Sequence, residues 1–185
     1  MLTRFFAFTA ISLALSPVTE AQHTTPTPYA GFETRAIKAL SAQQVEDLKA
    51  GRGMGLALPA ELNGYPGPVH VLELTAQLAL NDTQKRRMEE LLTAMKAEAV
   101  PLGERLLAQE AELDRLFVTR AITPRSLTET TAAIAATQGE LRATHLKYHL
   151  MTVEVLNPDQ IRRYSELRGY ASTGQHGGHS RQHSP

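Results

Sequence analysis

His145 and His149 are the two residues whose type and spacing best suit metal chemistry. They are four residues apart, so in a helix they lie on adjacent turns of one face and can bind a single cation. Glu98 is expected beside His145 if two long helical segments fold back on each other, and His70 can approach from a short preceding helix. Imidazole and carboxylate ligands of this kind suit Zn, Ni, Co or Cu(II). The alternative is structural, with His145 hydrogen-bonded to Glu98 between the helices and His149 exposed to solvent.

A second set of histidines lies near the C-terminus, in a segment rich in glycine and serine. His176, His179 and His183 belong to this tail, which spans residues 169–185 and is expected to be disordered. A flexible histidine tract can bind divalent metal weakly, because ordering the chain opposes binding. The alternative is a solvated tail with no site.

Nothing in the sequence indicates an enzyme, and no catalytic residue is predicted. The glycines at 51, 53 and 55 do not follow a predicted strand, so they do not form a phosphate-binding loop. There is no cysteine among the 185 residues, which excludes thiol catalysis, disulfides and thiolate zinc sites. The 19 basic residues balance the 19 acidic ones, so no general attraction to nucleic acid is expected.

The first 21 residues have the pattern of a secretory signal peptide. Arg4 precedes an apolar stretch, and small residues stand at the positions expected before cleavage after Ala21. This predicts export to the periplasm or beyond the cell, with Gln22 as the mature N-terminus; the alternative is a short uncleaved anchor. No run of 18 apolar residues occurs, so stable membrane insertion is not expected.

The remainder of the chain is predicted to be all-α. Strand patterns are nearly absent, and the apolar residues are mainly leucine, alanine, methionine and isoleucine, which helices tolerate well. Residues 22–68 form a Pro/Gly-rich leader with short helical pieces, and residues 51–68 of it are expected to be loop. Residues 69–168 form a helical hairpin domain, with helices expected over 69–79, 82–120, 124–156 and 158–168.

The two longest patterns predict a bent antiparallel hairpin. Apolar residues from Met88 to Leu116 recur with alternating steps of four and three, and a more polar version continues from Leu127. Thr123 and Pro124 are suited to start the second helix, because threonine caps well and proline fits the first helical position. Pro101 removes a hydrogen bond inside the first helix and should bend it. A bent hairpin has a concave side, where a partner could bind.

Three helix starts share one arrangement of a leucine, a capping residue and a glutamine three residues after the cap. Two of them consist of Leu80, Asn81 and Gln84, and of Leu156, Asn157 and Gln160; the third begins at Ser41. The cap accepts a hydrogen bond from the third residue of the helix, whose glutamine side chain accepts one in return.

These two segments, LNDTQ at 80–84 and LNPDQ at 156–160, resemble the LTxxQ motifs of the Spy/CpxP family of periplasmic proteins. Asparagine replaces the family's threonine in both, and asparagine also caps well. The resemblance covers residues 70–168 and extends to heavy-metal resistance proteins of the CnrX and ZraP type. It implies a homodimer that acts in envelope stress or metal response, either by binding unfolded clients or an envelope sensor protein, or by binding a divalent metal. The metal-binding relatives carry a histidine pair in their N-terminal helix, of which this chain has only His70.

Overall fold

The computed structural model describes residues 28–170, and every regular element in that range is helical. A 3₁₀ turn, η1 (Phe32–Thr34), precedes three short helices, two long ones and a final short one. The six α-helices are α1 (Ala42–Lys49), α2 (Leu58–Glu61), α3 (Pro68–Glu73), α4 (Asp82–Val118), α5 (Pro124–Val153) and α6 (Pro158–Leu167). The all-α prediction is confirmed. The predicted signal peptide and histidine-rich tail lie outside the described residues, except for Gly169 and Tyr170.

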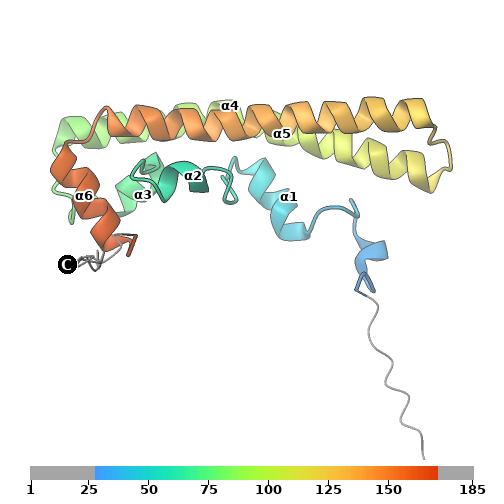
Figure 1. The fold of residues 1–185 in the computed structure, drawn as a ribbon, viewed down its shortest axis with the longest axis horizontal. Helices are drawn as coiled ribbons and strands as arrows, with labels where there is room; N and C mark the ends of the chain where they lie inside the picture. The colour runs from blue at the N-terminus through green and yellow to red at the C-terminus, as the bar shows by residue number, and fades with distance from the viewer. Residues whose placement is uncertain (1–27, 171–185) are drawn as a thin grey trace, which may run out of the picture.

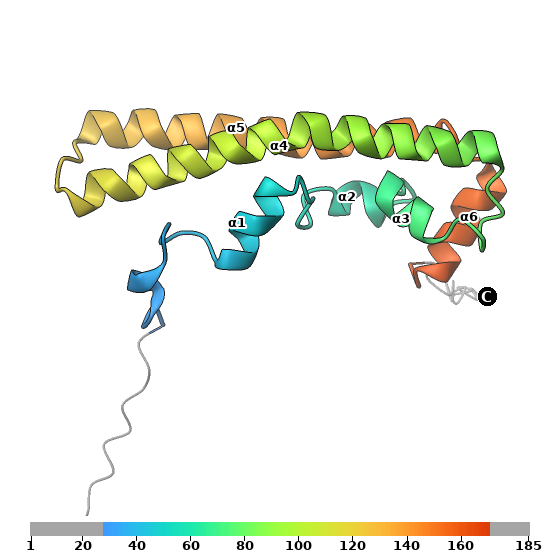
Figure 2. The ribbon, with the colours of Figure 1, turned by 180° about the vertical axis from the view of Figure 1, so that it is seen from behind.

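The two long helices lie side by side and run in opposite directions, joined by residues 119–123 (Figure 1). Pro101 lies inside α4 without ending it, and the C-terminal half of α4 slants away from the line of the first half (Figure 2). Helices α1, α2 and α3 lie on the side towards which α4 slants, and α6 crosses the end of the pair (Figure 2). The concave side expected from the sequence is therefore covered along residues 42–73.

All three predicted capping boxes are present. The side chains of Ser41, Asn81 and Asn157 each accept a hydrogen bond from the backbone N–H of the third residue of their helix. In return, the backbone N–H of each cap donates to the side-chain oxygen of that third residue, a glutamine. Thr123 caps α5 as predicted, with Ser126 in the glutamine's place. These bonds join residues three apart, which is why the sequence alone located them.

Gln84 and Gln160 also bind each other, a contact that the capping pattern did not predict. Gln84 Nε2 donates to Gln160 Oε1 at 2.9 Å, and Gln160 Nε2 donates to Gln84 Oε1 at 3.1 Å. The remaining donors bind the carbonyl oxygens of Val155 at 3.0 Å and Leu78 at 3.2 Å. Each amide thus uses both donors and accepts two bonds, so this pair, in which Gln160 is buried and Gln84 partly buried, ties the start of α4 to the start of α6.

The buried apolar residues form two clusters along the long helices. One surrounds the start of α4 and contains Met88, Leu91, Tyr148 and Tyr164, with α3 and α6 packed on it. The second contains Leu48 from α1 against Ala99, Leu106, Ile134 and Leu141. Residues 42–68 therefore share a core with the long helices, and no packing boundary lies at residue 68.

The heptad pattern predicted part of this burial correctly. Met88, Met95, Ala99 and Leu106 are buried in α4 as expected, but Leu91 and Gly103 are buried as well, because short helices cover a second face of α4. In α5 the predicted Leu127, Thr131 and Gln138 are exposed, whereas Thr137 is buried.

Close packing of α1 against α4 leaves room only for glycine at position 103. A Cβ added there would lie 2.3 Å from the carbonyl oxygen of Leu48, so α1 approaches the backbone of α4 directly.

Within residues 28–170 no helix is long and apolar enough to cross a membrane.

Candidate functional site

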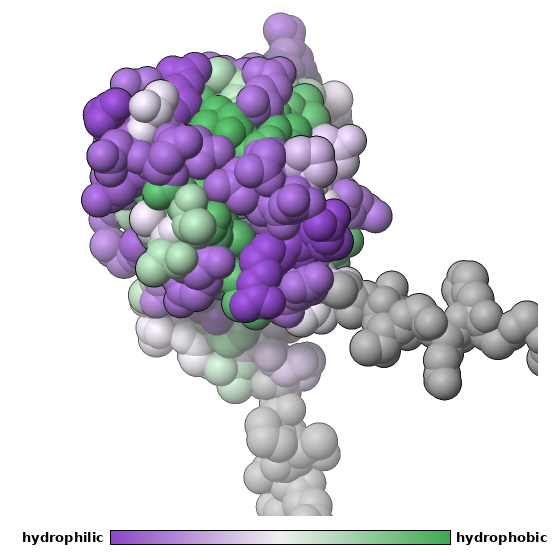
Figure 3. All heavy atoms as spheres, turned by 90° about the vertical axis from the view of Figure 1, so that its left-hand side faces the viewer, coloured by the Kyte–Doolittle hydropathy of each residue, from purple (hydrophilic) through white to green (hydrophobic). Residues whose placement is uncertain are grey.

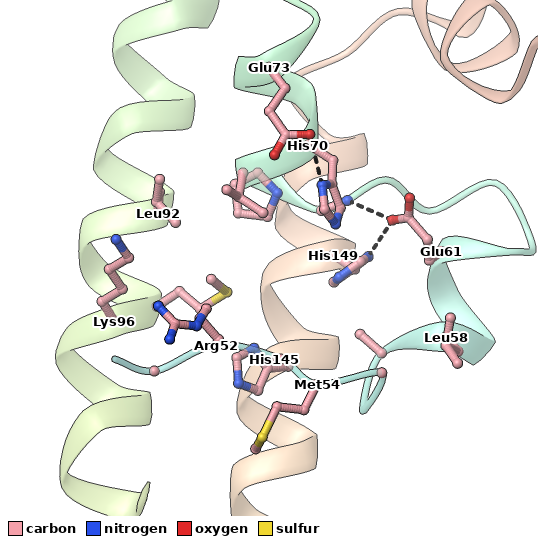
Figure 4. Close-up of a pocket in the computed structure, with 18 of the residues that line it drawn as sticks. Arg52, Met54, Leu58, Glu61, His70, Glu73, Leu92, Lys96, His145 and His149 are labelled. Atoms are coloured by element: carbon pink, nitrogen blue, oxygen red, sulfur yellow. Dashed lines mark hydrogen bonds and ion pairs between the residues drawn. The ribbon is translucent and has the colours of Figure 1, made fainter. Parts of the chain in front are cut away.

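His145 and His149 of α5 line a cavity of about 420 Å³ together with residues of α4 and the segment 51–73 (Figure 4). His145 is only 2% exposed and His149 only 8% exposed. His149 was expected to be exposed in the structural alternative, and that expectation is wrong. The reason is that the Gly/Pro-rich segment packs directly on this face of α5.

Two glycines of that segment lie against the two imidazoles. A Cβ on Gly67 would lie 2.8 Å from both Cε1 and Nε2 of His149, and one on Gly53 would lie 3.5 Å from Nδ1 of His145. Any larger residue at position 67 would push His149 or the segment away. Gly67 thus lets the backbone approach His149, a role that the sequence alone did not reveal, whereas a Cβ on Gly53 would make only an ordinary van der Waals contact with His145.

The hydrogen bond of His149 determines its tautomer. Nδ1 lies 2.6 Å from the carbonyl oxygen of Tyr65, which can only accept, so Nδ1 carries the hydrogen and donates. A neutral His149 then has its lone pair on Nε2, the atom beside Gly67. Only this nitrogen remains able to bind a metal ion.

Glu61 is a buried carboxylate that links the segment to two other helices. Its Oε2 accepts a hydrogen bond from the backbone N–H of Gly67 at 3.3 Å and lies 3.7 Å from Nδ1 of His149 (Figure 4). Its Oε1 accepts a hydrogen bond from the hydroxyl of Tyr164. Arg168 Nε lies 4.0 Å from Oε1. Burial, together with the bond to Glu61, raises the pKa of Tyr164. Glu61 was not identified from the sequence, because its partners are distant in the chain.

His145 differs from His149 in its polar contacts. Its Nε2 is buried and has no hydrogen-bond partner within the described part of the chain. Burial lowers the pKa of His145, with a smaller effect from the charge of His149. The ring is therefore held neutral at physiological pH, which is the form that binds metals or donates a single hydrogen bond.

Glu98 does not contact His145. It accepts from the Tyr148 hydroxyl at 2.8 Å and from Lys147 Nζ at 2.5 Å, and it does not line the cavity. The predicted bond between His145 and Glu98 is wrong, because the two helices pair two or three residues further along α5 than a symmetric turn implies. The hydrogen bonds from Lys147 and Tyr148 lower the pKa of Glu98. Burial of the Tyr148 hydroxyl, together with its bond to Glu98, raises the pKa of Tyr148 to about 12.

His70 does reach the cavity, as expected from the sequence. Its Nδ1 lies 3.1 Å from Oε2 of Glu73 one turn later, and both residues line the cavity with His145 and His149 (Figure 4). Within residues 28–170 no three His, Asp or Glu side chains are grouped closely enough to hold a metal ion. The tail histidines His176, His179 and His183 lie outside the described residues.

The segment that covers the histidines also carries exposed apolar side chains. We call five of them, whose exposed fractions run from 38% to 54%, the 54–69 apolar residues: Met54, Leu58, Leu62, Tyr65 and Val69. Three of these five also line the cavity, namely Met54, Leu58 and Val69. By contrast, the end of the molecule at which α6 lies has a mostly hydrophilic surface with separated hydrophobic patches (Figure 3).

Searches for similar proteins found no match to this chain among family models, curated proteins or solved structures.

Proposed function

We propose that this protein is a Spy/CpxP-like helical protein of the periplasm that binds unfolded clients, in a chaperone-like role during envelope stress. The observation that carries the proposal is the set of exposed 54–69 apolar residues around a cavity. Exposed apolar residues gathered on one segment are typical of surfaces that bind other proteins. The capping pairs at 80–84 and 156–160 and the signal-peptide pattern support the family and the compartment.

The client site differs from the one expected for a bare hairpin. Helices α1–α3 cover one side of the long pair, so clients meet the outer surface of the covering segment. Leu62 and Tyr65 offer apolar area there without lining the cavity.

The test is suppression of aggregation of a chemically unfolded protein. The double variant Leu62→Ser/Tyr65→Ser should lose much of the suppression, because it removes exposed apolar area. The matched control is Phe117→Ser/Val118→Ser at the far end of α4, where exposure is similar at 54% and 66%. Equal losses in the two variants would contradict a client site on the segment, and no suppression by the parent protein would contradict client binding itself.

A second function, divalent metal binding in a sensor or resistance role, is favoured by one observation. His70, His145 and His149 line the same cavity. Zn, Ni, Co or Cu(II) bound there would stabilise the folded state by RT ln(1+[L]/Kd).

The metal hypothesis is tested by melting the protein with and without each ion. His145→Ala/His149→Ala should abolish the rise in melting temperature, while deletion of residues 172–185 should leave it in place. Loss of metal uptake with the deletion alone would assign binding to the tail. No change in metal content or melting for either variant would contradict both sites.

A further inference from the structure

We propose that the cavity between α4, α5 and the segment 51–73 binds a small organic acid, with an apolar body and one carboxylate. This goes beyond client binding, because the ligand is a free small molecule held inside the cavity. The volume of about 420 Å³ falls within the range of small-molecule sites, about 300–1,000 Å³.

The apolar body is matched by the walls of the cavity. Leu92 and Met95 of α4 form one wall, and Ala57, Leu58 and Val69 line the cavity from the covering segment. Met95 and Ala57 are nearly fully buried, whereas Leu58 and Val69 are more than one-third exposed. A ligand that filled the cavity would shield these mouth residues from water, which favours binding.

The carboxylate is indicated by how the charges in the cavity are paired. Glu61 is already bonded to Gly67 and Tyr164, and Glu73 is bonded to His70 and lies 3.5 Å from Arg168. The acidic groups are therefore occupied by partners within the protein. An added cation would have to compete with them.

The basic groups of the cavity are less completely paired. Lys96 is exposed and forms no ion pair within residues 28–170, and Arg52 binds Asp47 through Nε at 2.6 Å, which leaves its terminal nitrogens free for a second carboxylate. Both lie on the same side of the cavity (Figure 4). His145 also lines the cavity, and its buried Nε2 has no hydrogen-bond partner within residues 28–170.

The experiment is calorimetric titration of the purified protein with octanoate as the probe. Octanol keeps the apolar body without the charge, and acetate keeps the charge with almost no body. We expect saturable binding of octanoate and at least about tenfold weaker binding of each of the other two. Equal affinity for octanol would overturn the role of the basic groups, and absence of octanoate binding at millimolar concentration would overturn the proposal.

Two variants place the ligand in the cavity. Lys96→Met keeps the aliphatic stem and removes the charge, so it should weaken octanoate binding about five- to tenfold with little effect on octanol. Val69→Trp at the mouth should fill the cavity and abolish binding. Lys85→Met, an exposed lysine of α4 that does not line the cavity, is the matched control and should bind octanoate like the parent.

Unchanged octanoate affinity in both Lys96→Met and Val69→Trp would assign the binding elsewhere and overturn the proposal. Lys96 is exposed, so its variant should fold even if the tryptophan variant does not. The client test uses Leu62 and Tyr65, which do not line the cavity, so the two proposals can fail separately.

Discussion

The two ends of the long helical pair differ in how many neighbours they have. At the end where α4 starts and α5 stops, α3 and α6 pack on the pair, and Met88, Leu91, Tyr148 and Tyr164 are almost inaccessible to water. Near the turn at 119–123, Leu113 and Leu116 are only partly buried, and Phe117, Val118 and Leu127 are exposed.

This difference shows that two helices alone do not bury a leucine. A side chain between two helices keeps contact with water on its open sides, whereas a third element closes them. The stability of the fold should therefore be concentrated at the covered end, and the turn end should open first.

The largest expected effect is loss of a core side chain at the covered end. Leu91→Ala should lower the free energy of unfolding by about 3–5 kcal/mol, because Leu91 is 2% exposed and its cavity cannot collapse. Leu116→Ala, the same change near the turn, should cost about 1 kcal/mol or less. Urea denaturation measures both. Similar losses would contradict the proposed concentration of stability.

Next in size is a pair of glycine substitutions in the two long helices. Gly103→Ala should destabilise by about 2–3 kcal/mol, because its Cβ cannot fit beside the Leu48 carbonyl and α1 must move. Gly139→Ala meets nothing within 4 Å, so the higher helix propensity of alanine should stabilise by about 0.5–1 kcal/mol. Thermal unfolding of the two variants should therefore shift in opposite directions. A stabilising Gly103→Ala would show that α1 is not held against α4.

A smaller difference in the free energy of unfolding is expected between two capping boxes, those that start α6 and α5. Gln160→Ala should cost about 2 kcal/mol, since it leaves donors and acceptors of Gln84, Asn157 and Leu78 unmatched at a buried position. Ser126→Ala removes the equivalent bond at the exposed start of α5 and should cost about 0.5 kcal/mol. If chemical denaturation gave equal values, the contact between the two glutamines would add nothing to the capping box.

The smallest effect concerns pH. The folded-state pKa of His145 lies below its unfolded value, so the unfolded chain binds more protons, and stability falls as the pH drops below ~6.5 towards the folded pKa. His145→Gln should make the free energy of unfolding less dependent on pH between 8 and 5.5. His70→Gln is the control, because His70 is partly exposed beside Glu73 and its loss should leave that acid-induced decrease in place. An unaltered pH dependence in His145→Gln would show that another group is responsible.

The sequence was sufficient for the features that depend on residues close together in the chain. Ser41, Asn81, Thr123 and Asn157 start their helices as predicted, because each cap bonds to a residue three positions away. The predicted helices over 82–120, 124–156 and 158–168 are confirmed to within a few residues of their ends. The +4,+3 pattern also identified Met88, Met95, Ala99 and Leu106 as buried.

Only the tertiary structure decided which groups distant in the chain meet. Glu98 binds Lys147 and Tyr148 because the pairing of the two helices is set by side-chain packing along their whole length, which the turn alone does not determine. The burial of His149 and Glu61 depends on a glycine-rich segment whose own sequence has no periodicity to indicate where it docks. Local hydrogen bonds are specified by spacing, whereas these contacts require the chain to be folded before their partners come into reach.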